Sequence, residues 1–287
     1  MADEAPADAL ILRPMTAEDV EGVGALAQQR GRNVGAEDYA RFLALEGARG
    51  FVLSRDGMLL GVGTVMRYFD HAFLGPILLR ADADGLAIAL LAQLVEAMQR
   101  DGVGTLEAEA GTAEEPILAR MGFALVRRTL VLERQAGGRA DATGTVRMEA
   151  HHLLDVGALD AAAVGYGRKE YLLALARELP AAARVVEREG DVVGYALLRR
   201  APRGYALGPV VTRGADPDAA AALVRDALSA AAGAPVVILV PEESALLPAL
   251  EREGFRPVGS LARMRAGPTP SAGGEATEWA LGSRITG

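Results

Sequence analysis

The stretch GMLLGVGTVMRYFDHAFLGPILLR, residues 57–80, decides the fold, because it recurs as GDVVGYALLRRAPRGYALGPVVTR at residues 190–213. Two glycines, the triplet Leu-Gly-Pro and a final arginine keep their places in both copies, at a constant offset of 133 residues. Outside this stretch, Gly122-Phe123 returns as Gly254-Phe255, and Arg13 returns as Arg147. Several matches at a nearly constant offset predict two copies of one structural unit.

The segment between the two copies, QAGGRADATGT at residues 135–145, is rich in glycine and polar residues and contains no large apolar side chain. Such a composition is typical of a linker. We therefore divide the chain into an N-terminal domain (residues 1–134), the linker (135–145) and a C-terminal domain with a tail (146–287). A length of 287 residues fits two domains, since about 150 residues is a usual size for one.

Each copy shows the same order of predicted elements: strand, two helices, a three-strand meander, helix, strand, helix and strand. Asp56-Gly57 separates two apolar runs and predicts a hairpin, and Leu86, Leu90, Leu94 and Met98 form a stripe at helical spacing. In the first copy we expect strands at 10–13, 51–54, 59–66, 73–79, 105–110 and 123–132, with helices from residue 16, over 36–46, over 86–98 and ending at 122. In the second copy we expect helices over 152–178, 216–231 and 242–252, a hairpin at 183–199, and strands at 205–211, 235–240 and 255–265. The pattern predicts an α/β fold (α+β, with a mixed sheet) that is used twice.

Composition excludes several classes of function. The chain carries 38 acidic and 30 basic residues, a net charge of −8, which argues against a general binder of nucleic acid or acidic membranes. It has no cysteine and only three histidines, so we expect no disulfide, no cysteine nucleophile and no metal site. The acidic start lacks the features of a signal peptide, and the apolar run at residues 86–95 is about half of a membrane span. We expect a cytoplasmic protein, and composition leaves the oligomeric state open.

At this point the chain resembles the GNAT superfamily of acyl-CoA N-acyltransferases, in a tandem arrangement. The order of elements is similar, and so is the short helix that ends in Gly-Phe before the last strand. The second half resembles the C-terminal domain of tandem GNAT proteins most clearly. The segments that carry this resemblance are GYGRKEYLLAL (165–175), VVGYAL (192–197), YALGPVV (205–211), DPDAAAAL (216–223), EREGF (251–255) and EWALGSRITG (278–287).

The resemblance implies a cofactor motif, Arg/Gln-x-x-Gly-x-Gly/Ala, between the third meander strand and the next helix. Its free N–H groups and the helix N-terminus hold the CoA pyrophosphate. The first copy has Asp-Ala-Asp-Gly-Leu-Ala at residues 82–87, with the motif's last Gly-x-Ala but an aspartate at the basic position. The second copy has no glycine there, and Asp216-Pro217 predicts a helix cap instead. The resemblance therefore implies acetyl-CoA, or another acyl-CoA, in the first domain. The implied cofactor-binding residues are Leu78, Leu79, Arg80, Gly85, Leu86 and Ala87.

Candidate catalytic residues are Glu109, Glu107 and His71. Many family members use a tyrosine to protonate the departing thiolate, but the corresponding positions here are Leu118 and Leu250. Glu107 and Glu109 are two residues apart and share one face of the predicted strand 105–110, so either is a candidate base. The alternative is that these carboxylates lie on a solvated strand face and His71 on the surface, with bound water as the base.

The expected activity, by resemblance, is the transfer of an acyl group, most simply acetyl, from CoA to an amine of a small molecule. Strand N–H groups in the first domain polarise the thioester carbonyl, and the second domain shapes the acceptor pocket. Two alternatives stay open: a non-catalytic module that binds a metabolite or a protein, and a GNAT fold recruited to a different biosynthetic reaction in the cleft between the domains.

Three further features favour structural roles. Arg168, Lys169 and Glu170 open a helix, where surface salt bridges are the expectation and the lining of a substrate cleft is the alternative. His151-His152 is expected to be an exposed pair at a helix cap, and Trp279 is expected to pack onto the second domain.

Overall fold

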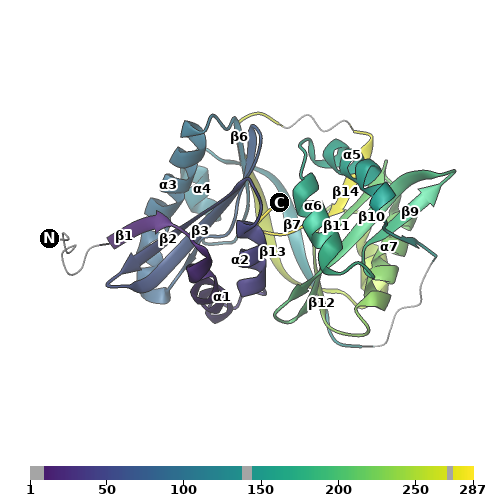
Figure 1. Cartoon of the computed structure of the whole chain (residues 1–287), viewed down its shortest axis with the longest axis horizontal. Helices are drawn as coiled ribbons and strands as arrows, with labels where there is room; N and C mark the ends of the chain where they lie inside the picture. Colours follow the sequence, from purple (N-terminus) through teal and green to yellow (C-terminus); the bar gives the residue numbers. More distant parts are fainter. Residues whose placement is uncertain (1–9, 138–143, 270–273) are drawn as a thin grey trace.

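The structure, a computed structural model, describes residues 10–137, 144–269 and 274–287, and two similar halves lie side by side along its long axis (Figure 1). The helices and strands of the first half are β1 (Leu10–Pro14), η1 (Ala17–Asp19), α1 (Val20–Gln29), α2 (Ala36–Leu43), β2 (Ala48–Arg55), β3 (Met58–Tyr68), β4 (His71–Leu74), β5 (Leu78–Leu79), η2 (Ala81–Leu86), α3 (Ala87–Arg100), β6 (Thr105–Ala110), α4 (Glu115–Arg120) and β7 (Ala124–Arg134).

The second half repeats this order and adds one strand from the tail. Its elements are β8 (Val146–Arg147), η3 (Ala150–His152), α5 (Leu153–Val164), α6 (Lys169–Glu178), β9 (Arg184–Arg188), β10 (Asp191–Ala201), β11 (Gly204–Arg213), α7 (Pro217–Ala230), β12 (Val236–Pro241), α8 (Leu247–Arg252), β13 (Arg256–Ala266) and β14 (Ala276–Ala280). The predicted α/β fold with a mixed sheet is confirmed.

The repeated hairpins form for the same local reason. Asp56 and Gly57 both have positive φ (50° and 74°), and so do Glu189 and Gly190 (55° and 90°). Two successive left-handed residues match the twist of the paired strands, which favours Asx-Gly and similar pairs. Helix α7 begins as predicted, because the Asp216 carboxylate accepts a hydrogen bond from the Ala219 N–H (2.9 Å).

Some boundaries differ from the prediction. The expected strand 73–79 is interrupted at Gly75-Pro76 and forms β4 and β5, whereas the equivalent Gly208-Pro209 lies within the continuous strand β11. The expected helix 242–252 starts only at Leu247. Strand β14 was not predicted, because a short apolar stretch in a tail carries no clear periodicity.

The two halves exchange their closing strands. The strand order is β1-β2-β3-β4-β6-β13-β7-β12-β11-β10-β9-β8, so β13 of the second half lies between β6 and β7. Strand β7 of the first half pairs in turn with β12, from Val236↔Arg134 to Pro241↔Thr129. Figure 1 shows these two long strands crossing between the halves. One continuous sheet therefore runs through the whole molecule.

The apolar core is shared as well. One cluster joins Tyr39 and Phe73 of the first half to Tyr166 and Tyr195 of the second. Ala262 and Met264 on β13 pack with first-half residues, and Leu132 on β7 packs with second-half residues. Burial of apolar surface across the boundary, at roughly 25 cal/mol per Å², stabilises the two halves as a unit.

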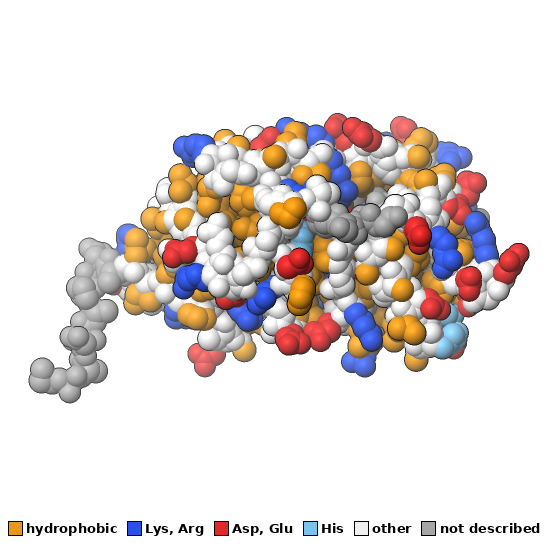
Figure 2. Space-filling model, turned by 90° about the horizontal axis from the view of Figure 1, so that it is seen from above, with side chains coloured by type: hydrophobic (Ala, Val, Ile, Leu, Met, Phe, Trp, Pro, Cys, Tyr) orange, Lys and Arg blue, Asp and Glu red, His pale blue; other side chains and the backbone are white. Residues whose placement is uncertain are grey.

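The outer surface carries both signs of charge. On the face shown in Figure 2, basic and acidic side chains are interspersed, with no broad basic area. Among the described helices, none has the length and apolarity needed to cross a membrane.

Candidate active site between the two halves

A wedge opens in the sheet of the first half where β4 and β6 separate. The two strands are parallel neighbours from His71↔Thr105 to Leu74↔Ala108. Beyond Leu74 the chain turns away through Gly75-Pro76, and β5 pairs with β3 on the other side. Pro76 has no N–H to donate to β6. Backbone on both sides of the wedge is thereby left without a strand partner.

The corresponding wedge in the second half is filled by the tail. Strands β11 and β12 pair in parallel only from Tyr205↔Val236 to Leu207↔Ile238. Past that point β14 pairs with β11, and the Leu281 N–H donates to the Leu239 carbonyl oxygen (3.0 Å). A Cβ atom at position 208 would lie 2.0 Å from the Leu281 carbonyl oxygen, so the close approach of the tail requires Gly208.

Trp279 fixes the tail in this position. Its side chain is buried and its indole N–H donates to the Thr212 hydroxyl (2.7 Å). The prediction that Trp279 packs onto the second domain is confirmed.

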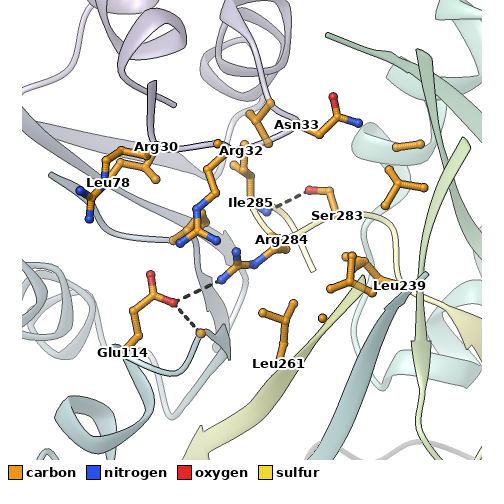
Figure 3. Close-up of a pocket in the computed structure, with 18 of the residues that line it drawn as sticks. Arg30, Arg32, Asn33, Leu78, Glu114, Leu239, Leu261, Ser283, Arg284 and Ile285 are labelled. Atoms are coloured by element: carbon orange, nitrogen blue, oxygen red, sulfur yellow. Dashed lines mark hydrogen bonds and ion pairs between the residues drawn. The ribbon is translucent and has the colours of Figure 1, made fainter. Parts of the chain in front are cut away.

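A cavity of about 670 Å³ lies at the open wedge, between the two halves. Its walls are residues 76–79 and 111–114 beside the wedge, the segment 30–34 between α1 and α2, parts of β12 and β13, and residues 282–285 of the tail. Figure 3 shows residues of both halves and of the tail around this space. Six segments, several of them far apart in sequence, thus form one site.

Of the six residues expected to bind the cofactor, three line this cavity and three are not among its lining residues. Leu78, Leu79 and Ala87 line it. Arg80, Gly85 and Leu86 are in or beside η2, which leads into α3. The Arg80 guanidinium is engaged by Asp82 (3.1 Å), and this hydrogen bond lowers the pKa of the Asp82 carboxyl.

The first turns of α3 and α7 differ in how they are capped. No side chain caps α3, whereas the Asp216 carboxylate caps α7 and is itself bound by Arg188 (2.7 Å). An anion therefore meets competing negative charge at α7. Among the described residues, no side chain competes for the first turn of α3, where the Ala87 N–H donates to the Asp84 carbonyl oxygen of η2.

The middle of the cavity holds charged side chains that the sequence did not single out. Glu114 accepts hydrogen bonds from the Gly111 N–H (2.6 Å) and from Arg284 (3.2 Å), and Arg284 also donates to the Glu109 carbonyl oxygen (2.8 Å). Burial lowers the pKa of Arg284, and the charge of Arg32 adds to this effect. Only the fold brings a tail residue to a loop of the first half, so no local signal in the sequence pointed to Arg284.

Glu107 and Glu109 are buried in ion pairs, so the expectation of a solvated strand face is wrong. Arg263 on the exchanged strand β13 binds Glu107 (2.6 Å) and Glu109 (3.3 Å), and Arg265 binds Glu107 (2.6 Å). Burial raises the pKa of Glu109. At Glu107 burial acts in the same direction, but Arg263, His71 and Arg265 outweigh it and lower the pKa. Neither carboxylate is among the residues that line the large cavity.

His71 is also buried, which corrects the expectation of a surface histidine. Its ring stacks on Tyr166 with centroids 4.0 Å apart, and Nε2 lies 3.5 Å from a Glu107 oxygen. Burial lowers its pKa to about 4, because the attraction of Glu107 only partly offsets desolvation. His71 thus links a first-half strand to the second half, outside the lining of the cavity.

We expect this histidine to make the protein sensitive to mild acid. In the unfolded chain its pKa is near 6.5, so between pH 6.5 and 4 the unfolded state binds the proton and the folded state does not. The free energy of unfolding should therefore fall by about 2 kcal/mol between pH 7 and pH 5. Urea unfolding of the wild type and of His71→Gln at both pH values measures this. An identical loss in both proteins would show that His71 is not the cause.

Arg168 corrects a further expectation, because it is buried and not on the surface. Its guanidinium binds Asp160 (2.9 Å) and Glu278 of the tail (2.8 Å). It fixes α5, α6 and β14 to one another within the second half.

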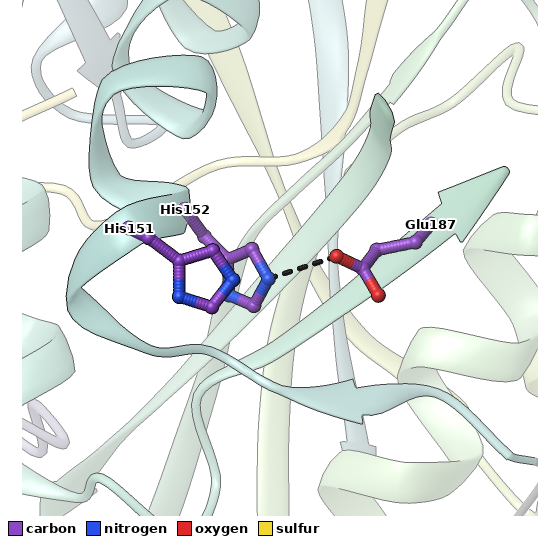
Figure 4. Close-up of side chains that lie close together, drawn as sticks. All are labelled: His151, His152 and Glu187. Carbon is purple, nitrogen blue, oxygen red and sulfur yellow. Dashed lines mark hydrogen bonds and ion pairs between the residues drawn. The ribbon is translucent and has the colours of Figure 1, made fainter. Parts of the chain in front are cut away.

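His151, His152 and Glu187 form a separate group on the second half (Figure 4), in which one ligand atom from each lies within 4.8 Å of the others. His152 is buried and bonded at both ring nitrogens: Nδ1 accepts from the Glu149 N–H (2.9 Å), and Nε2 faces Glu187 (2.9 Å). An Nδ1 acceptor leaves the proton on Nε2, the atom that a metal would need. The geometry favours a helix cap. The expectation that both histidines are exposed holds for His151 alone.

Comparisons with known proteins agree with this architecture. A model of the acetyltransferase (GNAT) domain family matches residues 156–276. A putative acetyltransferase from Pyrococcus horikoshii superposes with a TM-score of 0.81 at 19% identity, over 100% of this chain and 99% of that one. A tandem GNAT protein from the clavulanic acid biosynthesis pathway gives a TM-score of 0.62 at 16% identity, over 92% and 100%. The chain is a tandem GNAT-fold protein. A search of curated proteins finds no match.

In this tandem GNAT-fold protein, the two positions that carry a proton-donating tyrosine in many relatives belong to the core. Leu118 and Leu250 are both buried among apolar side chains of α4 and α8 and their surroundings. Neither leucine side chain can donate a proton.

Proposed function

We propose that this protein is an acyl-CoA-dependent N-acyltransferase whose acyl-CoA binds in the wedge of the first half. One observation carries the choice of half: the first wedge opens on a cavity of about 670 Å³, whereas β14 fills the second. The family model and the solved acetyltransferases of the same fold support the class of reaction.

The residues of the first wedge fit a CoA thioester. The edge at Leu78 and Leu79 offers backbone to an extended chain with amide groups. The N-terminal end of α3 offers its positive dipole to a pyrophosphate, while the Ala87 N–H itself donates to the Asp84 carbonyl oxygen. Arg30 lies on the same side, where it pairs with Asp84 (3.2 Å). When bound, the thioester supplies an activated acyl carbon beside the wedge.

Acyl transfer then needs a free amine held against that carbon. The amine nitrogen attacks, a C–N bond forms, the C–S bond breaks, and CoA leaves as a thiolate that takes a proton from solvent. We propose Glu114 as the group that receives the amine proton, directly or through water, because it lines the cavity and one of its oxygens has no hydrogen-bond partner among the described residues. Of the sequence-based candidates, Glu107 and His71 have buried side chains in contacts between the two halves. Glu109 pairs with Arg263 and also lines the small hollow at the wedge.

A charge placed at Ala87 should strongly weaken cofactor binding. Ala87→Glu puts a carboxylate at the first residue of α3, where it both fills the cavity wall and repels phosphate, so acetyl-CoA affinity should fall about 100-fold. Ile88→Glu adds the same charge one residue later, on an exposed side chain outside the lining, and should change the affinity less than about threefold. Calorimetry with acetyl-CoA and CoA measures both.

The variant Asp216→Ala tests, in the same experiment, which of the two halves binds the cofactor. It removes the cap of α7 and should leave acetyl-CoA binding unchanged. Stronger binding in this variant, with no change in Ala87→Glu, would place the cofactor in the second half. Absence of binding to the wild type would favour the second candidate function, a binding module without CoA. The aspartates at positions 82 and 84, beside the proposed phosphate site, are the observation in its favour.

A further inference from the structure

The cavity has an excess of positive charge. Its lining contains five arginines and three carboxylates, in a chain whose net charge is −8. Arg30 is paired with Asp84, Arg199 with Asp38 and Arg284 with Glu114. Positive charge that the fold does not neutralise is available to a ligand.

Arg32 is the clearest example of a positive charge in the cavity that the fold does not neutralise. Within the part of the chain that the structure describes, no carboxylate pairs with its guanidinium, and its Nε is buried without a hydrogen-bond partner. The turn that carries Arg32 is held by backbone bonds, from the Arg32 N–H to the Ala27 carbonyl oxygen (2.9 Å), and by the positive φ of Gly31 (71°). The fold therefore does not need the side chain of Arg32 in order to form this turn.

Arg32 and Arg284 extend into the same part of the cavity, near Glu114 (Figure 3). Two guanidinium groups close together repel each other, and one carboxylate balances only one of them. Glu114 follows β6 and lines both the large cavity and the small hollow beside the wedge at Pro76 and Ile77. The unbalanced positive charge is thus next to the place proposed for the thioester.

We propose that the acceptor of this enzyme is an amine that carries a carboxylate, with the carboxylate bound by Arg32 and Arg284 and the amine directed toward Glu114 and the wedge. The proposal rests on the proposed acyltransferase function. Arginine suits this role because its planar fork of donors binds a carboxylate in two places. The cavity is positive at Arg32 and negative at Glu114. A small molecule with a carboxylate at one end and an amine at the other matches this order of charges.

Matched pairs of acceptors test the proposal. Tyramine and tyrosine, phenethylamine and phenylalanine, and 3-methylbutylamine and leucine differ within each pair only by the carboxylate. With acetyl-CoA, kcat/KM is measured for each member, in the wild type and in Arg32→Gln. The two members of a pair differ in the fraction of free amine. The quantity compared is therefore the ratio of kcat/KM for the amino acid to kcat/KM for the amine, and how this ratio changes from the wild type to Arg32→Gln. We expect this ratio to fall at least tenfold for one pair or more. Arg100→Gln, which removes an exposed charge far from the cavity, should leave it unchanged.

A binding measurement tests the proposal when turnover is too slow to measure. The N-acetyl derivatives of the same pairs are titrated into the CoA complex, and a preference of at least tenfold for one carboxylated product, lost in Arg32→Gln, supports the proposal. No such preference in any pair, while CoA still binds, overturns it without touching the proposed function. If Arg32→Gln weakens the binding of CoA by the same factor as the binding of the product, the arginine binds the cofactor phosphates and the proposal fails. Absence of CoA binding to the wild type is instead the failure of the proposed function.

Discussion

When the chain is cleaved between residues 137 and 144, the two fragments should stay associated as one folded complex. Neither half should fold when it is made alone. The reason is the exchange of closing strands. Among the described strands, β7 pairs only with β12 and β13 of the second half, and β13 lies between β6 and β7 of the first. An isolated first half would leave β7 without any strand neighbour, with its backbone groups unpaired.

The measurement uses a protease site inserted between residues 137 and 144. After cleavage, the two chains should elute together in gel filtration with the far-ultraviolet circular dichroism of the uncut protein. Their thermal midpoint should now rise with concentration, because unfolding has become dissociation. A mixture of residues 1–137 and 144–287, refolded together, should give the same species. If either half alone unfolds cooperatively as a monomer with a native-like spectrum, the exchanged strands are not essential for folding.

The sequence predicts local structure well and long-range pairing poorly in this protein. The Asp56-Gly57 turn, the stripe of helix α3 and the Asp216 cap of α7 depend on neighbours in the chain, and all three form as expected. The repeat correctly predicts that each half has the same elements. It does not predict that the closing strands exchange, because a strand inserted into its own half has the same pattern of residues.

The candidate site shows the same limit. Leu78, Leu79 and Ala87 were predicted near the cofactor from a motif, and they line the cavity. Glu107 and Glu109 looked like free carboxylates because their partner, Arg263, is more than 150 residues away in the chain. Arg284 and the filling of the second wedge depend on the path of the tail, which no spacing reveals. Pairing across such separations is fixed by the whole fold.

Arg263→Met should destabilise the protein by about 3–5 kcal/mol, because it removes an ion-pair partner from each of two buried carboxylates. The guanidinium is buried, binds both Glu107 and Glu109, and lies over the ring of Phe73, 4.9 Å from its centroid. Methionine keeps most of the apolar volume, so the loss reports the uncompensated charges more than a cavity. Urea unfolding followed by circular dichroism measures the change.

Adding Glu107→Gln and Glu109→Gln should recover a large part of that loss, since neutral amides avoid the cost of buried unpaired charge. Arg213→Met is a matched control: this arginine is half exposed, 4.0 Å from Asp191, and its loss should cost less than about 0.5 kcal/mol. The comparison also distinguishes structure from catalysis at Glu107 and Glu109. If the triple variant is stable and still transfers acyl groups, these carboxylates serve to join the halves. If the triple variant is no more stable than Arg263→Met, the ion pairs are not the source of the stability that Arg263 provides.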